Sequence, residues 1–181
     1  MHIRRVRPED EEMARYVEEC WLPYHRDLED AVSAHTLDVG EDLEDEVAFH
    51  VDLFDDPNNR LWVALDEVDD PTAPLAEVDA TFAGHLSVSL EPAPEPFESP
   101  DRLVIGDFWV RKQYRGTGLA DELVARAVQQ AREDGCEQLA LDVDVDNERA
   151  LAYYEKLGFE VGRHRMRVAS TRLSESLGDR S

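Results

Sequence analysis

The stretch VRKQYRGTGLA, from Val110 to Ala120, is the most informative part of this sequence. A strand-like apolar segment ends at Val110, a basic turn with Gly116 and Gly118 follows, and a helical apolar pattern begins at Leu119. Glycines let a turn point its backbone N–H groups toward one spot, and the first turn of a helix adds unpaired donors and a partial positive charge. This strand, turn and helix therefore predict a site for a pyrophosphate group.

The charge of the turn stands out against the rest of the chain. The sequence has 42 acidic and 19 basic residues and a net charge of −23, yet Arg111, Lys112 and Arg115 lie within five positions. We therefore expect an anion to dock here. Two common phosphate motifs do not fit, because G-x-x-x-x-G-K-[ST] does not occur and the stretch GTGLAD has Asp121 in place of the third glycine of G-x-G-x-x-G.

A third phosphate-binding motif does fit. Arg115, Gly118 and Ala120 match [RQ]-x-x-G-x-[GA], and a second signature runs from Asn147 through the string YEKLGF that starts at Tyr154. In this order, about a helix and a strand apart, the two signatures resemble those of the GNAT superfamily of acetyl-CoA-dependent N-acetyltransferases. The resemblance is firm over residues 103–159 and looser before them.

This resemblance implies an α/β fold in three layers, with a central, mostly antiparallel sheet, a splayed pair of parallel strands and flanking helices. A single domain is expected over residues 1–169, followed by a frayed tail at 170–181. Gly106, inside a predicted strand, indicates either the bulge that splays the strands in this family or a glycine needed for close packing.

Hydrophobic periodicity predicts the elements around the motifs. Pro23 is expected to separate a helix that ends near Trp21 from a second one between residues 24 and 35. Residues 67–79 are an expected loop, and 91–100 are a proline-rich flap or linker. The other expected helices are 43–54, 119–133 and 147–157, and the expected strands are 3–7, 61–65, 81–90, 103–110, 139–143 and 159–168.

The resemblance also assigns cofactor contacts. Val110 is expected to offer its backbone to the pantetheine amide of acetyl-CoA, and Phe108 to lie beside the cofactor's arm. Asn147 is expected to contact that arm and also to cap a helix. The N–H groups that should hold the pyrophosphate belong to Arg115, Gly116, Thr117, Gly118, Leu119 and Ala120.

Two residues are expected to carry the chemistry. Tyr154 is the candidate general acid for the leaving thiolate, with a place in the core as the alternative. Asp107 is the candidate general base, although Gly106 replaces the glutamate that precedes this aspartate in diamine acetyltransferases. Glu91 and His85 are reserve candidates for the base.

The acceptor is less defined by the sequence. Trp21, Tyr24 and His25 lie where the family forms part of the acceptor wall, and they are equally well explained as core residues. We expect a primary amine on a small molecule. The alternatives are a protein N-terminus or lysine, and a non-catalytic module that senses acyl-CoA.

The amino-acid composition indicates the cellular environment of the protein and narrows its partners. Acidic residues spread along the chain indicate a salt-rich cytoplasm, and they argue against nucleic acid as a partner. We expect neither a membrane segment nor a signal peptide. Cys20 and Cys136 fit no metal-ligand spacing, so no metal is expected and both are interpreted as reduced thiols, with a single bridge as the alternative. A homodimer stays open.

Overall fold

The computed structural model describes residues 1–40, 42–93, 96 and 100–178. The chain divides into two compact units, Met1–Asp146 and Asn147–Ser181. Among the described residues, the first unit holds the sheet, six helical segments and the glycine-containing turn, and the second holds two helices.

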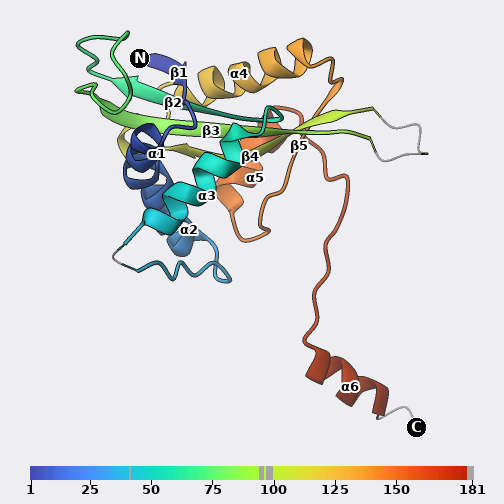
Figure 1. Cartoon of the computed structure of the whole chain (residues 1–181). Coiled ribbons are helices and arrows are strands. Elements are labelled where there is room, and N and C mark those ends of the chain that lie inside the picture. Colours follow the sequence, from blue (N-terminus) through green and yellow to red (C-terminus); the bar gives the residue numbers. More distant parts are fainter. Residues whose placement is uncertain (41, 94–95, 97–99, 179–181) are drawn as a thin grey trace. The chain divides into compact units, whose positions relative to one another are not determined.

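A five-stranded sheet forms the centre of the first unit, and its strands follow one another in chain order (Figure 1). The first three pairings are antiparallel, and the last is parallel. This confirms the predicted class, a mixed and mostly antiparallel sheet with one parallel pair. The strands are β1 (His2–Arg5), β2 (Asn59–Asp66), β3 (Thr81–Glu91), β4 (Arg102–Val110) and β5 (Gln138–Leu141).

The parallel pair is short. β4 and β5 pair only from Arg102 with Gln138 to Ile105 with Leu141, where β5 ends. β4 continues to Val110, so its last five residues have no parallel neighbour strand. The edge of β4 that faces away from β3 is therefore open just before the glycine-containing turn.

A β-bulge lies where β4 leaves its parallel partner. Leu86 of β3 pairs with Phe108 and Val88 pairs with Ile105, so the single residue Ser87 faces both Gly106 and Asp107. The bulge that Gly106 predicts is confirmed. The close-packing explanation holds as well, because a Cβ atom on Gly106 would lie 2.7 Å from Ser87 Oγ.

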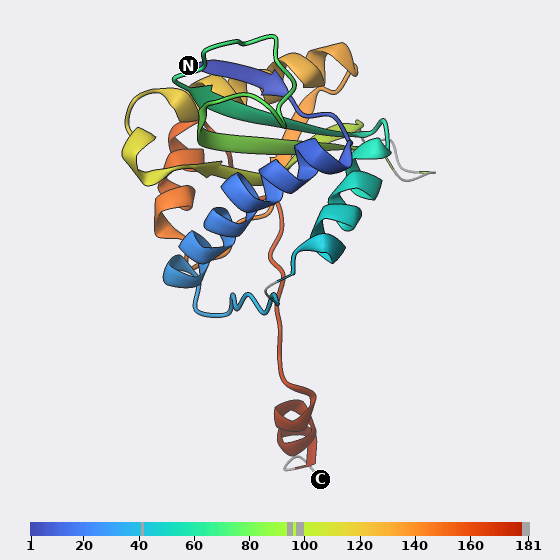
Figure 2. The same cartoon turned by 60° about the vertical axis from the view of Figure 1, so that its left-hand side comes forward.

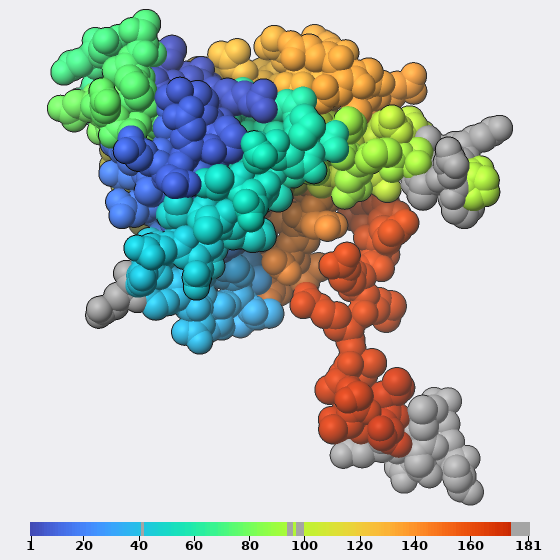
Figure 3. Space-filling model, in the orientation of Figure 1, coloured from blue at the N-terminus to red at the C-terminus, as the bar shows by residue number. Residues whose placement is uncertain are grey.

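Helices cover both faces of the sheet in the first unit. Figures 1 and 2 show α1 to α3 on one face and α4 on the other, and in Figure 3 the N-terminal helices form a continuous layer. The helical segments are α1 (Asp10–Tyr16), the π-helical η1 (Val17–Trp21), α2 (Leu22–Ala31), α3 (Glu44–Asp55), the 3₁₀ turn η2 (Lys112–Tyr114) and α4 (Leu119–Glu133).

The core fills the space between α1, α3 and the sheet. Tyr16 from α1, Phe54 from α3 and Phe82 from β3 are among its largest buried side chains. On the other face, α4 buries a stripe of residues four apart, as its sequence period predicts: Leu119, Leu123, Ala127 and Ala131.

The prediction that Pro23 breaks the helix is wrong. α1, η1 and α2 follow one another directly, with Pro23 in the first turn of α2. At the end of the π-helical segment the N–H of Leu22 reaches back to Val17 O. An α-helical residue at 23 would donate to Glu19 O, and Arg111 Nη2 donates to that carbonyl instead, at 3.0 Å. A wider turn and one arginine thus replace the hydrogen bond that proline lacks.

The second unit corrects another prediction. Residues 159–168 form no strand within the described residues, and exposed fractions of 73 % for Val161 and 92 % for Met166 show that these side chains are not packed. The alternation of apolar and polar residues is interrupted by Gly162 and by Arg163, Arg165 and Arg167, so neither face of the segment is apolar throughout. Helices α5 (Glu148–Lys156) and α6 (Ser170–Gly178) flank it, and α6 lies in the segment predicted as a frayed tail.

Candidate active site

The turn between β4 and α4 is open and rich in backbone donors. Gly116 and Gly118 have positive φ angles of 79° and 95°, and nothing lies within 4 Å of a Cβ atom placed on either. Gly118 caps α4 without any side-chain hydrogen bond. Within the described residues, no acceptor is found for the N–H groups of 116–120. Five uncapped donors at the start of a 15-residue helix form a site that suits an anion.

Two of the three basic side chains at this turn form hydrogen bonds within the protein. Arg111 donates from Nε to Phe82 O at 2.7 Å and from Nη2 to Glu19 O. Arg115 donates from Nε to Val110 O at 2.9 Å and pairs with Asp27 at 2.5 Å. The excess of acidic residues supplies internal partners for these arginines.

Lys112 is the base that stays available at the turn. Its side chain is exposed, and no partner is found for it within the part of the chain that the structure describes. The attraction of this turn for an anion therefore comes from backbone N–H groups, the dipole of α4 and one lysine.

Val110 presents its backbone at the open edge of β4. Arg111 N donates to Ala83 O across the β3–β4 pair, so in the alternating antiparallel pattern Val110 points its N–H and C=O away from β3. Arg115 Nε occupies the carbonyl, and the N–H faces the side from which β5 has already departed. Phe108, two residues earlier and half-buried, lies on the same stretch of β4.

Asp107 sits in the bulge and is half-buried. Its N–H donates to Ser87 Oγ at 2.8 Å, which fixes the backbone from which the carboxylate projects. Burial raises the pKa of Asp107 to about 6, while the charge of His35 acts in the opposite direction. A carboxyl group with this pKa is ionised at neutral pH and is a stronger base than an exposed aspartate.

Histidines and aromatic rings from η1, α2, the loop after α2, α3 and β3 form a cluster, and the sequence predicted only part of it. Trp21 is buried, while Tyr24 and His25 are half-buried, so the first fits the core and the other two line its edge. His35 and His50 were missed, because nothing in their sequence surroundings distinguishes them. Four of the chain's six histidines take part: His25, His35, His50 and His85.

The two reserve candidates for the base lie in unlike places. His85 is fully buried, burial lowers its pKa to about 3, and neither of its ring nitrogens has a hydrogen-bond partner in the described chain. Glu91 is exposed at the far end of β3, where it pairs with Arg102 at 3.4 Å. Neither arrangement resembles the partly open position of Asp107.

In the second unit, the end of α5 explains the string around Tyr154. Phe159 N donates to Tyr154 O and Gly158 N to Glu155 O, which is a Schellman motif closed by Gly158 at a φ of 92°. The rings of Tyr154 and Phe159 lie 5.6 Å apart across this motif. The motif thus holds the tyrosine ring, and burial raises the pKa of Tyr154 to about 12, so the phenol keeps its proton at neutral pH.

Asn147 caps α5, as its position predicts. Its Oδ1 accepts a hydrogen bond from Ala150 N at 3.2 Å. The segment 91–100, predicted as a flap or a linker, lies partly outside the described residues.

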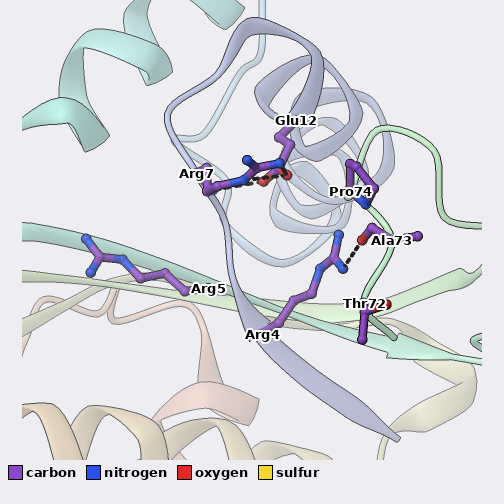
Figure 4. Close-up of a pocket in the computed structure, with 7 residues that line it drawn as sticks. All are labelled: Arg4, Arg5, Arg7, Glu12, Thr72, Ala73 and Pro74. Atoms are coloured by element: carbon purple, nitrogen blue, oxygen red, sulfur yellow. Dashed lines mark hydrogen bonds and ion pairs between the residues drawn. The ribbon is translucent and has the colours of Figure 1, made fainter. Parts of the chain in front are cut away.

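A separate cavity of about 300 Å³ lies between β1, α1 and the loop that precedes β3 (Figure 4). Arg4 points at Ala73 and donates a hydrogen bond to its carbonyl at 2.6 Å. Arg7 pairs with the carboxylate of Glu12, and the side chain of Arg5 points away from these two contacts. Since the facing guanidinium groups already bond to the protein, this cavity belongs to the attachment of the loop and is not a second candidate site.

No cluster of metal-ligating side chains is found among the described residues. Cys20 and Cys136 are both buried and unbridged. None of the described helices is long and apolar enough to cross a membrane.

Comparison with known proteins gives matching sequences and folds. The N-alpha-acetyltransferase MAK3 of Arabidopsis thaliana is 52 % identical over 50 residues, which are 28 % of this chain and 26 % of that protein. The glucosamine 6-phosphate N-acetyltransferase of Trypanosoma brucei brucei is 38 % identical over 89 residues, which are 48 % of this chain and 56 % of the relative. The chain thus spans between about a quarter and just over half of these curated relatives.

Solved structures match over nearly the whole chain. The BH1408 protein of Bacillus halodurans has a TM-score of 0.68 at 16 % identity, over 93 % of this chain and 99 % of that one. A predicted acetyltransferase of Clostridium acetobutylicum, solved with acetyl-CoA, has a TM-score of 0.65 at 14 % identity, over 94 % and 97 %. At these identities the likeness concerns the fold.

A model of the acetyltransferase (GNAT) family matches residues 34–159 of this chain. These residues include the open edge of β4, the turn and both sequence signatures. With the bulge, the short parallel pair and the uncapped turn in place, the chain belongs to the acetyltransferase (GNAT) family.

Proposed function

We propose that this protein is an acetyl-CoA-dependent N-acetyltransferase that moves an acetyl group directly from coenzyme A to the primary amine of a small molecule. One observation carries the proposal: in the described part of the chain, the turn at 116–120 has five N–H groups without an acceptor, and it directly follows a stretch of β4 that has no parallel partner. A diphosphate fits the turn, and an extended amide-containing arm fits the open edge.

Each predicted cofactor contact then has a stated role. In this proposal, diphosphate oxygens accept from the N–H groups of residues 116–120. The N–H of Arg115, which the sequence also assigned to the diphosphate, donates to Lys112 O at 3.3 Å instead, and the Arg115 side chain stabilises the turn through Val110 O and Asp27. The N–H of Val110 pairs with an amide oxygen of the pantetheine arm, and Phe108 lies beside that arm. Asn147 keeps its capping role at α5, and its contact with the arm is part of the proposal.

Asp107 and Tyr154 carry the chemistry in this proposal. At pH 7, deprotonating an amine with a lysine-like pKa costs about 4.6 kcal/mol, and the Asp107 carboxylate accepts that proton directly or through water. The free amine attacks the thioester carbon, a C–N bond forms, the C–S bond breaks, and the nitrogen releases its remaining extra proton to water as the neutral amide forms. The phenol of Tyr154 protonates the departing thiolate, which becomes the free thiol of coenzyme A, and the tyrosinate regains a proton from water.

Protein N-termini are a second candidate acceptor, and one observation favours them. The similarity to the N-alpha-acetyltransferase MAK3 reaches 52 % identity, although it covers only 50 residues. A lysine side chain and a non-catalytic acyl-CoA sensor complete the alternatives. For the setting, we propose a salt-rich cytoplasm, in which counterions screen the 42 acidic residues. Whether the protein forms a homodimer is measured in the experiment described next.

The deciding experiment incubates the full chain with acetyl-CoA in molar KCl and follows the released thiol. Small amines and short peptides with free N-termini form two arms of one panel, and mass spectrometry locates the acetyl group. Turnover in the small-amine arm supports the proposal, and turnover with peptides alone replaces it with the N-terminal activity. Tight binding of acetyl-CoA without turnover in either arm would support the non-catalytic acyl-CoA sensor instead. Light scattering of the same sample measures the oligomeric state.

A further inference from the structure

We propose that Asp27 is a positioning residue that fixes α2 against the end of β4, so that this helix forms a wall for the amine beside the proposed base, Asp107. This inference rests on the proposed function, which brings an amine to Asp107. Asp27 acts through two partners, Trp109 and Arg115, and both of them adjoin Val110, whose N–H faces the proposed cofactor arm.

A single carboxylate oxygen joins α2 to the end of β4 and to the turn that follows. Asp27 Oδ2 accepts from Trp109 Nε1 at 2.7 Å and from Arg115 Nη2 at 2.5 Å. Arg115 in turn donates from Nε to Val110 O at 2.9 Å. Hydrogen bonds to a charged acceptor are shorter and stronger than neutral ones, so this oxygen is a firm point of attachment for the helix.

The attachment of α2 depends on such polar contacts, because the helix buries little. None of its ten residues is buried, whereas the preceding helical segments, α1 and η1, each bury three. η1 also has its own bond to the end of β4, from Arg111 Nη2 to Glu19 O at 3.0 Å. Loss of the Asp27 contacts should therefore loosen α2 and leave η1 and α1 in place.

α2 covers the face of β4 that carries the proposed base. Trp109 and Asp107 are two residues apart on β4, beyond the bulge, so their side chains point to the same face of the sheet. Tyr24, one turn before Asp27, lies with its ring 5.5 Å from His85, the cross-strand partner of Trp109. An amine that approaches Asp107 on this face therefore lies next to α2.

The residues after α2 reach the chain that follows β5. Ser33 Oγ, just beyond the end of α2, donates to Asp146 Oδ2 at 2.9 Å. α2 and this loop thus connect the end of β4 with the segment after β5, next to the stretch of β4 that has no parallel partner. The Ser33 contact is a single exposed bond with a neutral donor, so Asp27 is the stronger of the two attachments.

The first experiment measures amide hydrogen exchange in the full chain without acetyl-CoA or amine. Asp27→Asn keeps the size of the side chain and removes its charge, so exchange in α2 should accelerate about 10-fold relative to α1 and α4. A purely global loss of stability would accelerate the slowest amides of all three helices together. Asp30→Asn is the matched control, because Asp30 is exposed on the same helix and has no partner in the described structure.

The second experiment compares the kinetics of these two variants with an accepted amine. In Asp27→Asn, kcat/KM for the amine should fall by about 10–100-fold, mainly through KM, because the wall moves while the base stays on β4. The calorimetric affinity for coenzyme A should change little, since Arg115 keeps its bond to Val110 O. Asp30→Asn should behave as the wild-type chain does.

Three results would overturn the proposal. One is equal exchange of the α2 amides in folded Asp27→Asn and Asp30→Asn, and another is an equal kcat/KM for the amine. The third needs only the wild-type chain: a Trp109 indole N–H, identified among the three tryptophan signals by Trp109→Phe, that exchanges as fast as an exposed one.

Failure of the proposed function would look different. If α2 loosens in Asp27→Asn but the wild-type chain acetylates no amine, the proposed function fails, and Asp27 is a structural anchor without a positioning role. If the wild-type chain acetylates an amine and Asp27→Asn does so with the same kcat/KM, the proposed function stands and the positioning role is refuted.

Discussion

The hydroxyl of Ser87 occupies the space that a side chain at residue 106 would need. A Cβ atom on Gly106 would lie 2.7 Å from Ser87 Oγ, and the same oxygen accepts the N–H of Asp107 at 2.8 Å. One hydroxyl on β3 therefore holds the bulge of β4 and fixes the backbone of the candidate base.

Gly106→Ala should destabilise the fold by about 1–3 kcal/mol, because the new methyl group overlaps the Ser87 hydroxyl. Ser87→Ala removes that oxygen, and the nearest remaining atom would then be Ser87 Cβ at 3.9 Å. The double variant should therefore recover part of the stability lost by Gly106→Ala alone. Urea unfolding of the four proteins gives the coupling energy, and strictly additive effects would contradict the overlap.

Gly118→Ala should weaken binding of coenzyme A more than Gly118→Asn does. No atom lies within 4 Å of the added Cβ, so the cost arises from the φ of 95°, which disfavours alanine by about 1–2 kcal/mol and which asparagine tolerates better. Calorimetric titration with coenzyme A measures the affinities, and thermal unfolding separates strain from lost contacts. Equal affinities for the two variants would mean that the turn does not need this conformation to hold its ligand.

Lys112→Ala should mainly weaken the binding of coenzyme A, whereas Arg115→Ala should mainly lower the stability of the fold. Lys112 is exposed at the turn, so its loss should weaken coenzyme A binding and reduce the salt dependence of that binding, with little change in stability. Arg115 bonds to Val110 O and Asp27, so its loss should cost about 1–3 kcal/mol of stability. Calorimetry at two salt concentrations and urea unfolding test both variants. A stability loss confined to Lys112→Ala would reverse the assignment.

The arrangement of these basic residues shows where sequence reasoning stops. Their clustering in an acidic chain correctly drew attention to the turn, but the sequence does not show which acidic or carbonyl groups lie nearby in space. Arg111 reaches Glu19 O, 92 residues away, and Arg115 reaches Asp27, 88 residues away. Such long-range partners depend on the packing of η1 and α2 against the end of β4, which no local pattern encodes.

Local patterns were reliable where local physics dominates. The amphipathic period of residues 119–133 gave α4 with its observed bounds, Gly106 marked the bulge, and Gly158 marked the end of α5. The predictions failed where an element depends on its surroundings. The alternating segment 159–168 forms no strand among the described residues, and Pro23 is accommodated in a continuous helical stretch because η1 and Arg111 compensate for it.

Asp107→Asn should stabilise the folded protein while it removes activity. Burial raises the pKa of Asp107 to about 6 in the folded state, above the value near 3.9 of an unfolded aspartate. The folded state therefore binds this proton more tightly, and stability is lost as pH rises from about 4 through 6. The variant's advantage should be absent below pH 4 and reach about 1–3 kcal/mol above pH 6. Urea unfolding across this range measures it, and an advantage that does not depend on pH would point to another cause.

Tyr154→Phe should lower kcat by about 10²–10⁴-fold with little change in stability or in the affinity for coenzyme A. The substitution removes only the phenol oxygen, so the ring contact with Phe159 and the Schellman motif that holds it are retained. Tyr153→Phe is the matched control, since the adjacent ring on α5 loses the same atom. The thiol-release assay in molar KCl provides the rates. Equal rates for the two variants would assign Tyr154 to the core alone, and the proton for the thiolate would have to come from water.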